Sequence, residues 1–183
     1  MIRLPKKFKY LQVVALVVAS VIYFGIKNLP ATNNVPVNTK EEWYHVERVV
    51  DGDTLKLSDG QRVRLIGVDT PELHYSDKLV RDAKKTGTDI KTIQAMGAKA
   101  SDFTKGLCAN KKVKIEFDVK KQDRYGRLLG YVYLEDGTFV NAKIIEEGYG
   151  QIMTVPPNVK YSDLFLKLEN KARQDKKGLW KSY

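Results

Sequence analysis

The sequence predicts a domain of the α+β class, and three observations lead to that prediction. Two apolar runs flank Asp59-Gly60, and a dipeptide of this kind is the strongest short signal for a β-hairpin. Residues 113–117 alternate apolar and charged side chains, and the apolar run 129–134 follows a tight turn, so both are predicted to be strands. Apolar residues also recur at the spacing of an amphipathic helix. They are Ile93, Met96, Ala100, Phe103 and Leu107.

The N-terminal part differs from the rest in composition. Residues 10–26 carry no charge and lie between a basic start and Lys27, which predicts an N-terminal apolar helix. The run is long for a signal-peptide core and short for a comfortable membrane span, so residues 1–27 are either a cleaved signal peptide or an uncleaved signal-anchor. We favour the anchor, over a cleaved signal and over a buried core helix, because no good small-residue cleavage site follows. The basic end would then lie inside the cell.

Residues 28–40 contain two prolines and four asparagines without an amphipathic pattern, which predicts a flexible linker. The folded domain is expected at residues 41–183. The N-terminal pattern places this domain outside the cytoplasm, either tethered to the cell membrane by a single pass or secreted after cleavage.

Charge suggests a polyanionic partner. The chain has 32 Lys and Arg against 22 Asp and Glu, a formal net charge of +10. Five of these positive charges lie in residues 1–27, which hold no acid, so residues 28–183 carry +5. Such a surplus is consistent with nucleic acid, whose binding is dominated by phosphate charge. The single cysteine, Cys108, excludes an internal disulfide, and we expect a buried inert thiol rather than a nucleophile. No zinc spacing, phosphate-cradling glycine loop or internal repeat is present, and His45 and His74 are far apart.

The hairpin at residues 58–61 brings acidic and basic side chains together. With a two-residue turn, counting places Leu55 opposite Arg64. Because neighbours two residues apart share a face of a strand, Asp53 and Asp51 then lie on the same face as Arg64.

Asp69 is an odd number of residues away from Arg64, so on a regular strand its side chain would point to the opposite face. The ladder must stop nearby, because Pro71 has no N–H to donate and holds Thr70 extended. A local bend there would swing Asp69 and Glu72 back toward Asp53. Carboxylates beside an arginine suit a hard cation such as Ca²⁺ or Mg²⁺ together with a phosphate, and a spare glutamate can activate a water. For any single residue of this set, a surface hairpin with scattered charges is the alternative.

The remaining segments complete the expected order of three strands, a helix, two strands and two helices. Asp-Arg-Tyr-Gly-Arg at 123–127 predicts a tight turn with a second arginine at the entrance of strand 129–134. Helices are expected at 139–145, stopped by Gly148, and at 164–172, followed by basic residues that suit a helix C-terminus. The basic stretch 74–92 is either a solvated loop or short helix, or a basic flap over a phosphate path.

These motifs together resemble the staphylococcal nuclease (thermonuclease) family. The resemblance covers residues 43–180. It rests on Val-Asp-Gly-Asp-Thr at 50–54, residues 64–72, residues 123–127, Val-Asn at 140–141 and the closing Gly-Leu-Trp at 178–180. The family's fold implies a five-stranded OB-fold β-barrel with three helices, a barrel that often binds nucleic acids. Its activity implies a Ca²⁺-dependent nuclease that hydrolyses DNA and RNA phosphodiester bonds with low sequence specificity and leaves 3′-phosphate ends.

The resemblance also implies which residues hold the ion and activate water. Asp53 and Asp69 match the calcium carboxylates, and Thr70 matches the residue that offers its backbone carbonyl. Glu72 matches the glutamate assigned as general base on the attacking water. Asp51 matches an acid near the metal.

On the substrate side, Arg64 and Arg127 match the two arginines that clamp the scissile phosphate, and Arg127 is the candidate for helping the leaving group depart. Arg124 stands where the family often has a lysine, and Tyr125 matches a tyrosine against the nucleotide. The metal ligands, general base and both arginines carry the family residue. This favours an enzyme over the alternative, a non-catalytic nucleic-acid-binding module tethered to the membrane. Nothing implies a protein partner, and we expect a monomer.

Two departures from the family pattern concern substrate binding. The positions of two base-covering tyrosines hold Thr154 and Pro156, so the base-stacking platform is expected to be thinner unless Tyr149 or Tyr161 substitutes. The second departure is the extra length at residues 74–92.

Overall fold

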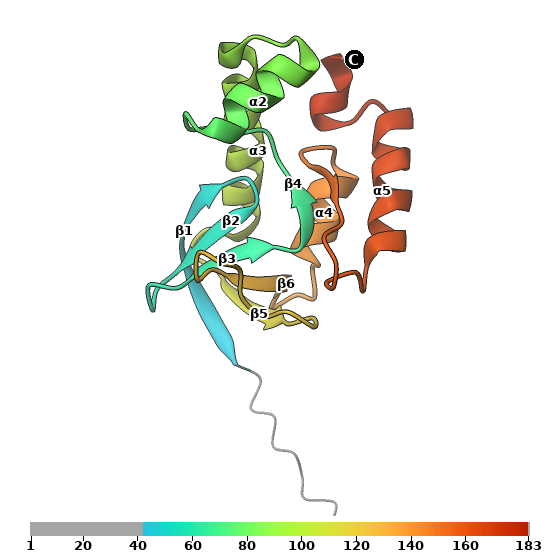
Figure 1. The fold of residues 1–183 in the computed structure, drawn as a ribbon. Coiled ribbons are helices and arrows are strands. Elements are labelled where there is room, and N and C mark those ends of the chain that lie inside the picture. Colours follow the sequence, from blue (N-terminus) through green and yellow to red (C-terminus); the bar gives the residue numbers. More distant parts are fainter. Residues whose placement is uncertain (1–41, 183) are drawn as a thin grey trace, which may run out of the picture. The chain divides into compact units, whose positions relative to one another are not determined.

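Five strands close into a barrel in the order β1–β2–β3–β6–β5 (Figure 1). This computed structural model describes residues 42–182. The barrel strands are β1 Trp43–Asp51, β2 Thr54–Leu57, β3 Arg62–Leu65, β5 Lys112–Glu116 and β6 Leu128–Leu134. All neighbouring pairs are antiparallel except β3 and β6. The five-stranded barrel of the α+β class is therefore confirmed.

The barrel interior is filled by the apolar half of each alternating strand. Leu55 and Leu57 of β2 are fully buried and face Val63 and Leu65 of β3, while the intervening side chains point outward. Tyr131 of β6 belongs to the same core and is 1% exposed. The alternation that predicted the strands is the same alternation that buries their inner faces.

The register of the β2–β3 hairpin differs from the prediction by one residue. Thr54 pairs with Arg64, whereas the prediction placed Leu55 there. The loop has three residues, because Leu57 N–H donates to the Gln61 carbonyl (2.9 Å) and Gly60 adopts φ +88°. Such a loop with glycine in the left-handed region is the next most common hairpin connection. Arg64 consequently lies beside the residue that directly follows Asp53.

The chain is redirected after β3 at Gly67, two residues before Asp69, near which the bend was predicted. Gly67 has φ +79°, and the Phe165 ring lies where a Cβ would stand. From this point β4, Gly67–Asp69, leaves the barrel and pairs with β7, Gln151–Met153, in a two-stranded sheet. Asp69 therefore ends a short strand of its own.

Four α-helices are present among residues 42–182, one more than predicted. They are α2 Asp77–Thr86, α3 Ile90–Cys108, α4 Val140–Glu146 and α5 Ser162–Gln174, followed by a 3₁₀ turn η1 at Gly178–Ser182. The three predicted helices correspond to α3, α4 and α5. The additional helix α2 lies within the basic stretch 74–92, begins where Ser76 Oγ accepts from Leu79 N–H (3.1 Å), and ends at Gly87 with φ +70°.

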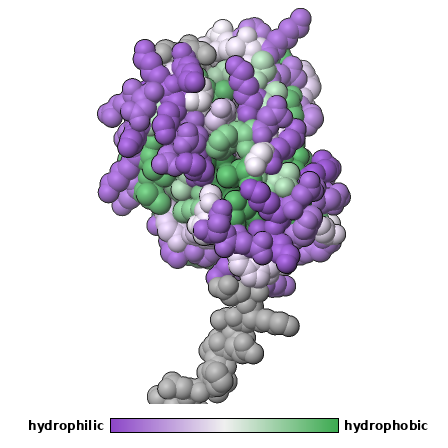
Figure 2. Space-filling view, turned by 180° about the vertical axis from the view of Figure 1, so that it is seen from behind, coloured by the Kyte–Doolittle hydropathy of each residue, from purple (hydrophilic) through white to green (hydrophobic). Residues whose placement is uncertain are grey.

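The domain surface is mostly hydrophilic. Seen from behind, charged and polar residues surround a central area where apolar residues show (Figure 2). Over residues 42–182, no helix combines the length and apolar character that a membrane crossing needs. The predicted apolar helix of residues 1–27 and the linker 28–40 lie outside the described residues.

Candidate active site

Asp53 ties the turn between β1 and β2 to the end of β4. Asp53 as a whole residue is 6% exposed. Oδ1 accepts from Thr54 Oγ1 (3.0 Å), and Oδ2 accepts from Thr70 N–H (3.2 Å) and Thr70 Oγ1 (3.1 Å). The same Oδ2 forms an ion pair with Arg64 Nη1. Burial of this carboxylate is thus offset by a full set of donors.

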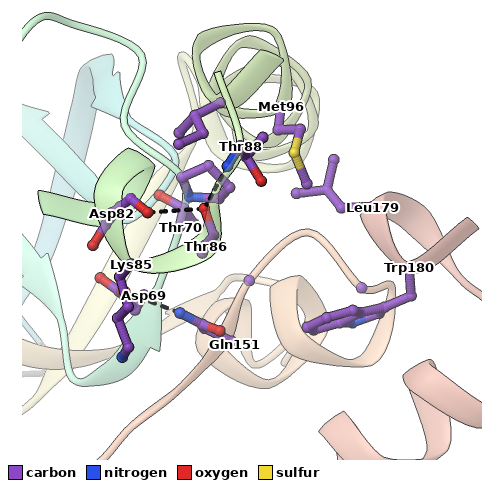
Figure 3. A pocket seen from close by; sticks show the side chains of 14 residues that line it. Asp69, Thr70, Asp82, Lys85, Thr86, Thr88, Met96, Gln151, Leu179 and Trp180 are labelled. Atoms are coloured by element: carbon purple, nitrogen blue, oxygen red, sulfur yellow. Dashed lines mark hydrogen bonds between the residues drawn. The ribbon is translucent and has the colours of Figure 1, made fainter. Parts of the chain in front are cut away.

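Arg64 joins the two acids that the sequence places on different strands. Besides its ion pair with Asp53, its Nη2 lies 3.3 Å from Asp69 Oδ1, and its side chain is only 12% exposed. The other oxygen of Asp69 accepts from Gln151 Nε2 on β7 (3.4 Å), as Figure 3 shows. Asp53, Arg64 and Asp69 therefore meet in one cluster despite the altered register.

Lys78 of α2 completes this cluster, and sequence reasoning missed it. Its ammonium lies 2.9 Å from Asp69 Oδ1, 2.8 Å from Glu72 Oε1 and 3.1 Å from the Thr70 carbonyl oxygen. Burial alone would lower the pKa of Lys78, but the charges of Asp69 and Glu72 raise it above its ordinary value, so the group is an ammonium. The only sequence signal was a lysine in a basic stretch, which does not set Lys78 apart from its neighbours.

Helix α3 braces the two segments that carry the acids. Thr104 Oγ1 donates to the Gly52 carbonyl (2.7 Å), which holds the turn before Asp53. Gly97 lies so close to the Glu72 backbone that a Cβ there would stand 2.6 Å from the Glu72 carbonyl carbon. Small and hydroxyl side chains on one helix face therefore position both halves of the cluster.

Asp51 lies at the end of β1, two residues before Asp53. Burial, followed by the charge of Asp53, raises the pKa of Asp51 to about 6, against the lowering effect of Gly52 N–H, which donates to its Oδ1 (2.8 Å). Asp51 thus keeps its proton to a higher pH than an ordinary aspartic acid does.

The second arginine motif is a self-contained turn. Asp123 Oδ1 accepts from the N–H groups of Tyr125 (2.9 Å) and Arg127 (3.0 Å), and its Oδ2 accepts from Arg127 Nε (2.7 Å). Burial alone would raise the pKa of Asp123, but these bonds from Arg127 and Tyr125 hold it below its ordinary range. Asp123 therefore fixes the direction in which the Arg127 guanidinium leaves the turn.

Both predicted phosphate arginines line one groove of about 480 Å³. Arg64 comes from β3, and Arg127 from the turn before β6. Arg124 and Tyr125 line the same groove, where Arg124 Cζ lies 4.8 Å from the centre of the exposed Tyr125 ring. The predicted substrate-binding residues are thus brought beside the phosphate arginines.

Neither proposed substitute for the family's tyrosines lines this groove. Tyr149 stacks on Phe103 at 4.3 Å between ring centres. The Tyr161 hydroxyl donates to the Glu116 carboxylate and accepts from the Tyr133 hydroxyl. Instead, the groove wall is formed by the 153–158 segment. Its lining residues there are Met153, Val155, Pro156, Pro157 and Asn158.

The oxygen cluster fits a divalent cation in ligand type and in charge. The atoms around the Lys78 ammonium are carboxylate and carbonyl oxygens, which are the ligands that Ca²⁺ prefers. In this structure the positive charge that they surround is the Lys78 ammonium itself. In the described part of the chain, no group of three or more His, Cys, Asp or Glu side chains is arranged to hold a metal. The Thr70 carbonyl would therefore be needed beside the carboxylates of Asp53 and Asp69.

Known proteins are similar to this chain in sequence. The model of the family described as "Staphylococcal nuclease homologue" matches residues 62–182. The protein named Thermonuclease of Staphylococcus hyicus is 37% identical over 171 residues, covering 92% of this chain and 93% of that protein. Thermonuclease of Staphylococcus intermedius is 40% identical over 146 residues (78% and 79%), and endonuclease YncB of Bacillus subtilis is 37% identical over 140 residues (74% and 60%). The chain belongs to the staphylococcal nuclease homologue family.

Proposed function

We propose that this protein is a Ca²⁺-dependent nuclease that cleaves DNA and RNA with low sequence specificity and leaves 3′-phosphate ends. Family membership, with relatives named thermonuclease and endonuclease, makes it a phosphodiester-cleaving hydrolase. The ion, the substrate range and the product ends are our proposal. One observation supports it most strongly: oxygens of Asp69, Thr70 and Glu72 converge on one cation position next to Arg64.

Asp53 and Asp69 would hold the ion with the Thr70 carbonyl. A bound Ca²⁺ supplies positive charge beside the phosphate oxygens. Thr54 and Thr70 keep the Asp53 carboxylate oriented through three hydrogen bonds, so the site is preorganised by the fold. Glu72 lies at the open side of the cluster, where its carboxylate can take a proton from an attacking water.

The two arginines act on the phosphate. A guanidinium fork matches two phosphate oxygens and stabilises the charge that develops as the phosphorus is attacked. Arg64 approaches from the acidic cluster and Arg127 from the Asp123 turn, and both side chains line the same groove. Arg127 would also neutralise the departing oxygen.

Arg124 and Tyr125 would contact the nucleotide next to the scissile bond. Tyr125 is 67% exposed, and an exposed aromatic face beside guanidinium groups is suited to stacking on a base of any sequence. The aliphatic wall at Met153 and Val155 offers less stacking than two tyrosines would. We therefore propose weak base preference and modest nucleotide affinity.

The test of catalysis is digestion of single-stranded DNA and RNA with Ca²⁺ or with a calcium chelator. We expect cleavage only with Ca²⁺, and a loss of about 10²–10⁴-fold for Glu72→Gln or Arg127→Ala. Glu135→Gln and Arg48→Ala change exposed residues on the turn after β6 and on β1, and serve as matched controls. Full cleavage in chelator, or by the Glu72→Gln/Arg127→Ala double variant, would refute the proposal. Binding without any cleavage would favour the non-catalytic module.

We further propose that the domain acts outside the cytoplasm as a monomer, anchored or secreted. The basic–apolar–basic pattern of residues 1–27 supports the location outside the cytoplasm. Mass analysis of the mature N-terminus, with membrane and medium fractionation, tests it. An intact chain in the membrane fraction supports the anchor, and a shortened chain in the medium supports a cleaved signal. An intact chain in the cytosol would refute both.

A further inference from the structure

The additional helix α2 sends one side chain into the candidate active site. Lys78 lies in its first turn, and the ammonium contacts one oxygen each from Asp69, Thr70 and Glu72 at 2.8–3.1 Å. Two of these three oxygens belong to residues that we assign to the metal ion, and the third belongs to the proposed general base. Lys78 therefore stands where both the ion and the activated water would act.

An ammonium and a divalent ion cannot share these oxygens. Calcium needs its ligands at about 2.3–2.6 Å, so an ion held by Asp69 and the Thr70 carbonyl would lie within contact distance of the Lys78 nitrogen. Like charges so close repel strongly, because Asp53 and Asp69 beside them are less than a tenth exposed and screening by water on that side is weak. Occupation of the site by one cation therefore excludes the other.

We propose that Lys78 is a built-in competitor for the divalent ion: it holds the metal ligands and the general base in the metal-free protein and leaves when the ion binds. This inference rests on the calcium site of the proposed function. As a consequence, Lys78 of α2 sets the calcium concentration at which the nuclease becomes active. Only those metal-free molecules in which Lys78 has left the site can bind the ion, so the apparent calcium affinity falls with their fraction.

The packing of α2 allows Lys78 to leave without disturbing the barrel. Leu79 is the only fully buried residue of this helix, and Gly87 in the left-handed region separates it from α3. A cavity of about 220 Å³ lies between α2, α3, β4 and the C-terminal turn (Figure 3). Asp82, Lys85 and Thr86 of α2 line it opposite Met96 and Leu179. A helix with a single fully buried side chain beside a cavity can shift at lower cost than a core helix.

The first test is calcium titration of the full-length protein by calorimetry. Lys78→Met keeps most of the side-chain volume and removes the charge. If Lys78 occupies the site in about nine-tenths of metal-free molecules, the variant binds Ca²⁺ about tenfold more tightly than the wild type. Lys84→Met, which removes an exposed charge from the same helix, should leave the affinity unchanged. Unchanged or weaker binding by Lys78→Met, while the wild type binds, would overturn the inference and leave the calcium site intact.

The second test needs no variant. Amide hydrogen exchange of α2 is measured in the wild type with chelator and with saturating Ca²⁺. We expect faster exchange over Asp77–Thr86 with Ca²⁺, because Lys78 loses its three contacts, and little change in the barrel strands. Slower or equal exchange in α2 would show that Lys78 stays in place and would overturn the displacement. If neither the wild type nor Lys78→Met binds Ca²⁺, the calcium site itself is refuted.

Discussion

Replacing Gly97 by alanine would push a methyl group into the backbone that carries Glu72. A Cβ at position 97 stands 2.6 Å from the Glu72 carbonyl carbon and 2.7 Å from its oxygen. Carbon atoms in contact prefer about 3.5–4.0 Å, so one of the two backbones must move by close to 1 Å. Helix α3 is 19 residues long and packs on the barrel, which leaves the Glu72 segment as the part that moves.

The expected effects on stability and on activity differ in size. Alanine is favoured over glycine inside a helix by about 1 kcal/mol. Overpacking of a tight contact costs about 1–3 kcal/mol, so the net loss of stability is about 0–2 kcal/mol. A catalytic group misplaced by about 1 Å can cost on the order of 10²-fold in rate. The Gly97→Ala variant is therefore expected to remain folded but to lose most of its nuclease activity.

Gly106→Ala on the same helix is the matched control. Gly106 is exposed, and a Cβ there meets nothing within 4 Å, so this variant should gain up to about 1 kcal/mol and keep full activity. Urea unfolding and initial rates of DNA cleavage in saturating Ca²⁺ provide the two readouts. A Gly97→Ala protein as active as Gly106→Ala would show that the contact between α3 and Glu72 does not position the general base.

Three further variants or treatments test the fold around the site. Asn141→Ala removes a fully buried amide that forms hydrogen bonds with three backbone groups of β6 and of the β3–β4 connection. The free energy of unfolding in urea should fall by about 3 kcal/mol or more, and a loss below about 1 kcal/mol would contradict this. Burial raises the pKa of the Cys108 thiol to about 12, so iodoacetamide at pH 8 should modify it only after unfolding, as mass spectrometry would detect; rapid modification of the folded protein would count against burial. Since the pKa of Asp51 is raised from 3.8 to about 6 in the fold, its ionisation destabilises the metal-free protein as pH rises between these values. Asp51→Asn should therefore be more stable relative to wild type at pH 8 than at pH 4, by about 1 kcal/mol or less after solvent screening, and a reversed trend in thermal unfolding would be inconsistent with the raised pKa.

Much of the fold followed from short-range patterns in the sequence. Alternation predicted the barrel strands, and the spacing of Ile93 to Leu107 predicted α3, because burial of one face imposes the period of the element. The acids and arginines of the candidate site were also identified from motifs. Their chemistry depends on residue type and order, which a linear sequence displays directly.

Tertiary structure alone decided how these pieces meet. The register of the hairpin changed by one residue because a left-handed Gly60 opened a three-residue loop, and the chain turned at Gly67 because Phe165 packs against it from almost a hundred residues away. Lys78 reaches the acidic cluster only once α2 has formed and has docked through Leu79. Residue types and their periodicity are local properties that a sequence can specify by itself. The position of a cation among three oxygens results from packing between distant segments, and it exists only in the folded chain.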